Sequence, residues 1–140
     1  MARRVVHVVV FAEPPLRVLL LRRPESRSAG WQGVTGRVEP TDATLADAAL
    51  REIAEETGLP PPDELWDLGL ERAFAGYDGH AYEQRSFAAR YRAPHAIERT
   101  PEHEESRWVS PEEARALYRW ESDVAGLALV EQRLRARGTQ

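Results

Sequence analysis

Three glutamates lie close together in the segment R-E-I-A-E-E-T-G at residues 51–58. Glu52, Glu55 and Glu56 stand at positions i, i+3 and i+4, so a helix would place them on one face. Like charges at this spacing destabilise an isolated helix by roughly a few tenths of a kcal/mol per pair, unless a cation lies among them. Mg²⁺ prefers oxygen ligands and binds through a few carboxylates together with substrate phosphates. The spacing therefore predicts a divalent-cation site that a phosphorylated substrate completes.

A second interpretation of this segment needs no metal. Exposed helices often carry acidic residues on their solvated face, and Arg51 could pair with Glu55 one turn later. For an isolated E-x-x-E-E pattern a solvated face is usually the better interpretation. The choice between the two therefore depends on what surrounds the helix.

The helix that carries the glutamates is predicted from Thr44 to Thr57. Apolar residues recur along it at helical spacing, namely Ala46, Ala49, Leu50 and Ile53. Thr44 and Asp47 are placed as an N-terminal capping box, and Gly58 followed by prolines at 60–62 ends the helix. The acids are thus predicted beside the apolar stripe that packs on the core.

The remaining segments predict a sheet. Runs of β-branched and apolar residues predict strands at 5–12, 17–23, 33–39, 68–74, 81–91 and 105–109. The first two strands are expected to form a hairpin, because the turn sequence Glu13-Pro14-Pro15 lies between them.

Two further helices are predicted after the strands. Ser110 would cap a helix that reaches Tyr118, and a last helix would cover residues 122–137 with Val124, Leu127 and Leu134 inward. The order strand, helix, strands and then helices favours an α/β fold with a mixed β-sheet sandwiched between helices. We expect residues 1–140 to form a single domain.

The composition excludes several classes of protein. The chain of 140 residues has no cysteine, so a disulfide framework, a thiolate nucleophile and a sulfur-ligated metal are excluded. Its formal net charge of −4 gives no general attraction to nucleic-acid polymers or to anionic membranes. No apolar run approaches the roughly 20 residues of a membrane span, and no secretory signal is recognisable. We therefore expect a cytoplasmic monomer or homodimer that acts on a small molecule.

The acidic helix and the loop before it resemble the signature of the Nudix hydrolases, G-x5-E-x7-R-E-U-x-E-E-x-G-U, where U is a bulky apolar residue. Eight positions match: Gly36, Arg51, Glu52, Ile53, Glu55, Glu56, Gly58 and Leu59. Between Gly36 and Arg51 the chain has one residue too many, so either Ala43 or Asp42 takes the place of the first glutamate of the signature. In the family that glutamate pairs with the arginine and supports the loop. We therefore expect Asp42 to contact Arg51.

This resemblance implies a reaction and a set of ligands. The metal ligands would be Glu52, Glu55, Glu56 and the backbone carbonyl of Gly36, with Mg²⁺ or alternatively Mn²⁺ as the metal. Water would attack phosphorus and split a nucleoside diphosphate that is linked to another group. Support of the loop would come from Arg51, Asp42 and Gly58.

One carboxylate must also accept the proton of the attacking water. Glu52 or Glu56 could do so, whereas several family members use a glutamate on a distant loop. The acidic segment at residues 101–105 is the natural source of such a group, and Glu102 is the candidate within it. A solvated acidic loop is the alternative interpretation of this segment.

A second resemblance concerns the substrate. The segment W-Q-G-V-T-G-R-V-E at 31–39 is similar to that of bacterial Nudix enzymes that act on dihydroneopterin triphosphate and deoxynucleoside triphosphates. Trp31 and Gln32 could stack on and hydrogen-bond a base or a pterin, although Trp31 could equally be a core aromatic. The implied reaction releases diphosphate and a monophosphate.

Other signals keep different functions open. Tyr77 lies where dinucleoside polyphosphate hydrolases of the family carry a tyrosine, whereas the proline typical of ADP-ribose hydrolases is missing from residues 65–78. Hydrolysis of a dinucleoside polyphosphate or of ADP-ribose is therefore an alternative. A non-catalytic Nudix-fold nucleotide sensor is an alternative of another class, which the complete glutamate trio disfavours. Trp66 and Trp108 are interpreted as packing residues.

Overall fold

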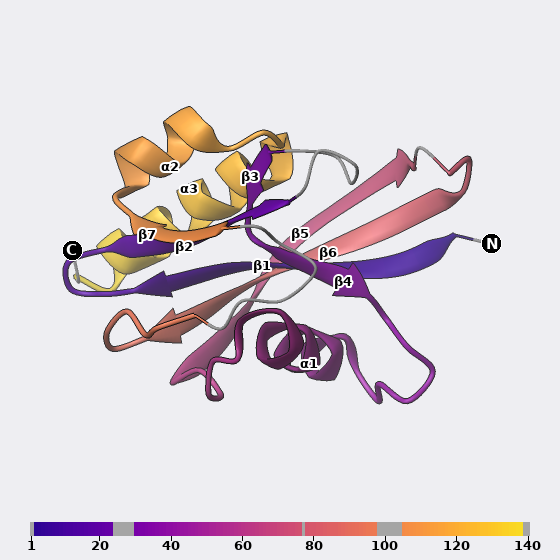
Figure 1. Ribbon diagram of the computed structural model, residues 1–140, viewed down its shortest axis with the longest axis horizontal. Coiled ribbons are helices and arrows are strands. Elements are labelled where there is room, and N and C mark those ends of the chain that lie inside the picture. The colour runs from indigo at the N-terminus through magenta and orange to yellow at the C-terminus, as the bar shows by residue number, and fades with distance from the viewer. Residues whose placement is uncertain (1, 24–29, 77, 98–104, 139–140) are drawn as a thin grey trace.

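The computed structural model describes residues 2–23, 30–76, 78–97 and 105–138. The strands in this part of the chain are β1 (Arg3–Ala12), β2 (Arg17–Arg23), β3 (Gly30–Gln32), β4 (Val34–Arg37), β5 (Glu64–Ala75), β6 (Ala81–Tyr91) and β7 (Glu105–Val109). The helices are α1 (Leu45–Thr57), α2 (Pro111–Leu117) and α3 (Glu121–Ala136) (Figure 1). No helix among these residues is long and apolar enough to cross a membrane.

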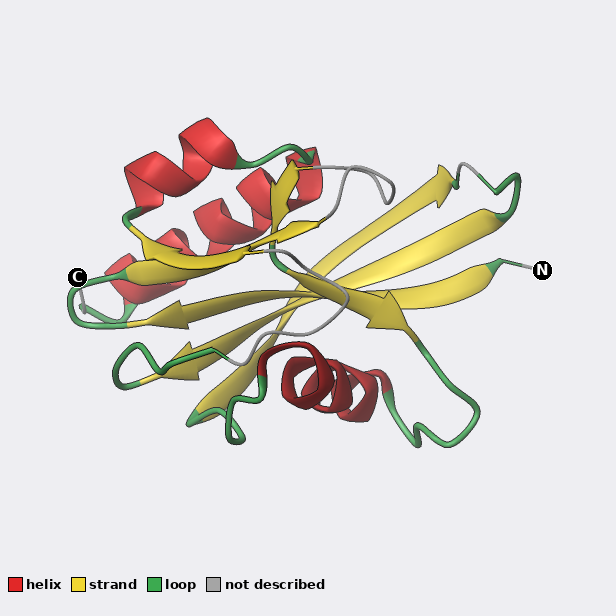
Figure 2. Cartoon of the chain, in the orientation of Figure 1, coloured by secondary structure: helices red, strands yellow, loops and turns green. Residues whose placement is uncertain are grey.

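The strands form one mixed sheet that lies between two layers of helix. α1 covers one face, and α2 and α3 lie together on the other (Figure 2). This arrangement confirms the predicted α/β fold with helices on both faces of the sheet.

The central strand is β1, which has three partners. It runs parallel to β6 along its whole length and antiparallel to β4 over residues 5–8. It pairs with β2 only at Phe11 and Ala12, next to the predicted hairpin turn. Beyond that point β4 takes the place of β2 beside β1.

Both faces of β1 are buried. Val6, Val8 and Val10 face α1, whereas Val9 and Phe11 face α2 and α3, and all five are fully inaccessible to solvent. A strand that is covered on both faces needs apolar side chains on both. This explains why apolar and polar residues do not alternate along residues 5–12.

α1 begins and ends as the sequence predicts. The Thr44 hydroxyl accepts a hydrogen bond from the Asp47 amide, and Gly58 closes the helix in a left-handed conformation with φ of 71°. The prediction for Leu50 was wrong, because this residue is 38% exposed. At about 100° per residue, Leu50 lies roughly 110° from the centre of the buried arc formed by Ala48, Ala49, Glu52, Ile53, Glu56 and Thr57.

α3 shows a similar deviation. Leu127 and Leu134 are buried as predicted, but Val124 is 38% exposed. It lies roughly 120° around the helix from the middle of the buried residues, which begin at Ser122 and Asp123. The core-facing side of α3 therefore starts with two polar residues.

Two strands differ from the predicted ranges. The predicted strand at 33–39 is shortened to β4 at 34–37, and an additional strand, β3, precedes it at 30–32. Gly33 lies between the two strands, and its amide donates to the Asp123 carboxylate. β5 starts at Glu64 rather than at 68, since its first residues already pair with β6, and a bulge between Asp67 and Leu70 interrupts that pairing. The strand propensity of single residues does not predict that pairing continues on the other side of such a bulge.

Candidate functional site

The site is built where β4 meets α1. Gly36 in β4 lies directly under the side chain of Glu52 in α1, because a Cβ atom on Gly36 would stand 1.9 Å from Cδ of Glu52 and 2.2 Å from its Oε2. Only glycine leaves room for the carboxyl group at this point. The signature's glycine at position 36 therefore has a steric reason.

Replacing Gly36 by alanine is expected to impair both folding and turnover. The added methyl group must displace the Glu52 carboxyl group or the strand, and overpacking of this kind costs about 1–3 kcal/mol. Thermal melting and steady-state kinetics would measure the two effects. Gly69→Ala is the matched control, because its Cβ would meet nothing within 4 Å although φ is 70°. We expect Gly36→Ala to lose both stability and kcat, and Gly69→Ala to lose at most stability. That difference would locate the effect on turnover at Glu52.

The three glutamates of α1 differ in exposure. Glu52 and Glu56 are 7% and 2% exposed and point toward the sheet, whereas the side chain of Glu55 is 56% exposed. Within the described residues, no group of three or more His, Cys, Asp or Glu side chains is arranged to hold a metal ion. Arg51 instead pairs with two of these carboxylates: its Nη1 lies 2.8 Å from Oε2 of Glu52 and 3.1 Å from Oε1 of Glu55.

The chemistry of this donor set still suits a hard divalent cation. The available groups are carboxylate and carbonyl oxygens, which Mg²⁺ and Mn²⁺ prefer, and the chain has no cysteine to compete with them. Two of the carboxylates are shielded from solvent, which strengthens their interaction with a cation.

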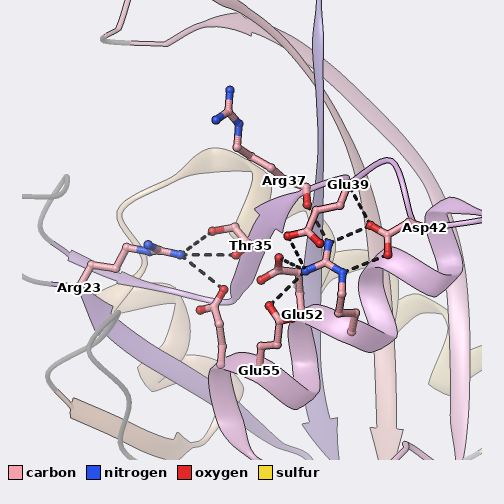
Figure 3. A network of polar contacts seen from close by, with 9 residues as sticks. Arg23, Thr35, Arg37, Glu39, Asp42, Glu52 and Glu55 are labelled. Carbon is pink, nitrogen blue, oxygen red and sulfur yellow. Dashed lines mark hydrogen bonds and ion pairs between the residues drawn. The ribbon is translucent and has the colours of Figure 1, made fainter.

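Asp42 and Arg51 form a two-pronged ion pair. Nε and Nη2 of Arg51 donate to Oδ1 and Oδ2 of Asp42 at 3.0 and 2.8 Å, and Nη2 also donates to the Arg37 carbonyl at 2.9 Å. Asp42 in turn accepts from the Glu39 amide at 2.8 Å. These contacts lower the pKa of Asp42, mainly through the Arg51 hydrogen bond and then through the Glu39 amide. Asp42 thus makes the contact to Arg51 that the sequence predicts (Figure 3).

Sequence reasoning missed Arg23, which ends β2. Its Nη2 donates to the Thr35 hydroxyl at 3.0 Å and lies 3.6 Å from Oε2 of Glu56 (Figure 3). The signal was available in the alternation of β2: Leu19 and Leu21 pack in the core cluster beneath α1, and Arg23 continues that face. The positively charged guanidinium of Arg23 therefore lies beside Glu56, the most deeply buried glutamate of the site.

Gln32 is engaged within the protein. It is 5% exposed, its Oε1 accepts from Nε1 of Trp120 at 3.1 Å, and its Nε2 donates to the Thr35 hydroxyl at 3.3 Å. The neighbouring Trp31 is partly buried against the core beneath α2 and α3, with the Arg107 guanidinium 4.9 Å from its ring centre. Both side chains therefore have protein partners, and a substrate would have to share or replace them.

The structure also places the remaining predicted residues. Trp66 is buried as a packing residue, and Trp108 packs against the core while its Nε1 donates to the His95 carbonyl. Glu102 and Tyr77 lie outside the described residues. Their predicted roles as a general base and as a substrate contact stay predictions.

Known proteins share the family and the fold of this chain. The family model of the NUDIX domain matches residues 1–128. The fold is similar to the dihydroneopterin triphosphate pyrophosphohydrolase of E. coli, with 26% identity, a TM-score of 0.75, and coverage of 89% of this chain and 91% of that one. It is also similar to the Ap4A hydrolase of C. elegans, with 18% identity, a TM-score of 0.81, and coverage of 96% and 99%.

One curated relative is a longer protein. An octanoyltransferase of Myxococcus xanthus is 38% identical over 99 residues, which cover 69% of this chain but 27% of the relative. The chain therefore matches about a quarter of that protein's length.

Proposed function

The chain belongs to the NUDIX family, and we propose that it is a pyrophosphohydrolase that uses Mg²⁺ to split a diphosphate linkage in a nucleoside or pterin triphosphate. The observation that carries the proposal is the pair of buried carboxylates on α1, Glu52 and Glu56, with Glu52 packed against Gly36. Water attacks phosphorus, and the products are diphosphate and the nucleoside or pterin monophosphate.

Nudix hydrolases generally use a divalent metal such as Mg²⁺. In this chain the side chains of Glu52, Glu55 and Glu56 and the carbonyl of Gly36 would hold it. When bound, the ion would neutralise phosphate oxygens and make phosphorus more electrophilic. Mn²⁺ accepts the same oxygen ligands and is the alternative.

The protein must also accept a proton and hold the phosphates. Glu56 is our first candidate for the general base, because Arg23 keeps its carboxylate in place at 3.6 Å. Glu52 is held between Gly36 and Arg51, which favours a role as ligand. Arg23 is only 16% exposed, and its guanidinium could pass from Glu56 to a phosphate oxygen of the substrate. Glu102 is the alternative base.

The substrate class is proposed from the segment at residues 31–36. The likeness to the E. coli dihydroneopterin triphosphate pyrophosphohydrolase supports a triphosphate of a flat heteroaromatic compound, which Trp31 would contact by stacking. The likeness to an Ap4A hydrolase keeps a dinucleoside polyphosphate as the second candidate.

A screen of substrates tests this proposal. Nucleoside triphosphates, dihydroneopterin triphosphate, ADP-ribose and diadenosine polyphosphates would be incubated with the protein and Mg²⁺, and the products separated by chromatography. We expect diphosphate and a monophosphate from one triphosphate, and loss of all turnover when EDTA removes the metal. No turnover with any of these compounds, together with retained nucleotide binding, would instead favour the sensor function.

A further inference from the structure

A second polar cluster lies buried on the face of the sheet opposite α1. Nε2 of His7 in β1 lies 2.8 Å from Oδ1 of Asp123 in α3, and Nδ1 of His7 lies 2.8 Å from the hydroxyl of Ser86 in β6. All three residues are 1% exposed. The same Oδ1 of Asp123 accepts the Gly33 amide at 2.9 Å. The cluster therefore connects three elements of the fold to the junction of β3 and β4.

These residue types are those of a serine hydrolase triad, but the cluster cannot act as one. The nucleophile of such a triad must reach a substrate carbonyl, and Ser86 is buried within the sheet at 1% exposure. Burial of three polar side chains, each with a partner, is instead typical of a network that fixes a local structure.

The element that this network fixes is β4. Asp123 holds Gly33, the residue immediately before β4, and three residues later Gly36 lies against the Glu52 carboxyl group. β4 pairs with β1 from Val34 to Arg37, and His7 lies in the middle of the paired stretch, opposite Thr35. Gly33 and Gly36 are thus the two ends of one short extended segment.

The start of α3 holds the preceding residue as well. Trp120, the N-cap residue of α3, donates to the Gln32 side chain, and Gln32 donates to Thr35 in β4. Two consecutive residues before β4 are therefore tied to one turn of α3. A shift of that turn would therefore also move β4, and with it Gly36.

We propose that His7 and Asp123 are positioning residues for the metal site: His7 orients the Asp123 carboxylate, Asp123 holds Gly33, and β4 thereby keeps Gly36 in register with Glu52. This inference rests on the proposed function, in which Gly36 and Glu52 are metal ligands. Residues that orient ligands without touching the metal typically change metal affinity by roughly 10–100-fold when replaced.

Two substitutions of Asp123 separate positioning from mere stability. Asp123→Ala removes the acceptor, whereas Asp123→Asn keeps an oxygen that can accept from both Gly33 and His7. Leu134→Ala is the matched control, because it leaves a cavity in the far end of the same helix, away from β4. Each protein would be studied by amide hydrogen exchange, by titration of the substrate-free protein with Mn²⁺ alone, and by kcat and KM.

For Asp123→Ala we expect the Gly33 amide to exchange roughly tenfold faster, and Mn²⁺ affinity and kcat to fall roughly tenfold or more with KM within about twofold. Asp123→Asn should restore most of these values, and Leu134→Ala should melt earlier without changing them. If Asp123→Ala does not fold, His7→Gln tests the same link, with smaller changes in the same direction.

The outcomes distinguish this inference from the function on which it rests. If Asp123→Ala binds Mn²⁺ as tightly as the wild-type protein and turns over equally fast, the positioning role is overturned and the proposed function is not. A fall in Mn²⁺ affinity of the same size in Leu134→Ala would also overturn it, because loss of stability would then explain the effect. Wild-type protein that binds no Mn²⁺ would overturn the proposed function first.

Discussion

Replacing Glu56 by glutamine is expected to lower kcat by roughly 10²–10⁴-fold, the range that a positioned general base contributes. Glutamine keeps the size of the side chain beside Arg23, but it loses the negative charge. Glu56 is 2% exposed, so solvent cannot replace that charge. The measurement is steady-state kinetics on the substrate identified by the screen, with Mg²⁺ varied, so that effects on turnover and on the metal requirement are separated.

The control is Glu112→Gln on α2, where the same chemical change affects an exposed residue. Glu102→Gln decides between the two candidate bases. Glu102 would be the base if Glu102→Gln lowers kcat and leaves substrate binding unchanged. In that case Glu56→Gln should mainly raise the Mg²⁺ concentration that turnover requires, as expected of a metal ligand. Unchanged turnover and unchanged Mg²⁺ dependence in Glu56→Gln would contradict the proposed site.

Local patterns predicted most elements of this fold, whereas the order of strands had to come from the structure. The limits of α1 followed from Thr44 and Gly58, whose chemistry acts within a few residues. The replacement of β2 by β4 beside β1 depends on contacts between distant parts of the chain. No periodicity within residues 30–37 contains that information, and β3 is too short to produce a period of its own.

The same distinction holds for the candidate site. Helical spacing placed Glu52, Glu55 and Glu56 on one side of α1, but it did not reveal that Glu55 would be far more exposed than the other two. At about 100° per residue, Glu55 lies roughly 110° from the centre of the buried arc, on the side opposite Leu50. The position of that arc is set by the sheet against which α1 packs. For Arg23, the alternation of β2 indicates the face on which it lies, but its contact with Glu56 depends on how β2 and α1 pack together.

Replacing Arg51 by lysine is expected to lower kcat by roughly 10–100-fold, although the charge is kept. Lysine cannot donate from two nitrogens to both oxygens of Asp42 while also reaching the Arg37 carbonyl and Glu52. The loop at residues 38–44 would then lose its link to α1. A displacement of about 1 Å at reacting groups can cost roughly 100-fold in rate. Steady-state kcat and the melting temperature are the measurements.

A double-mutant cycle with Asp42→Asn tests whether the two residues act as a unit. We expect Asp42→Asn alone to slow turnover, and the double variant to be little slower than Arg51→Lys, because both changes break one contact. The chain supplies a matched control in Arg85 of β6, whose Nε and Nη2 donate to both oxygens of Asp67 in β5 at 2.9 Å. Arg85→Lys removes the same geometry and should leave kcat unchanged. Additive effects of Arg51→Lys and Asp42→Asn would show that Asp42 does not replace the first glutamate of the Nudix signature, and the extra residue between Gly36 and Arg51 would then need another explanation.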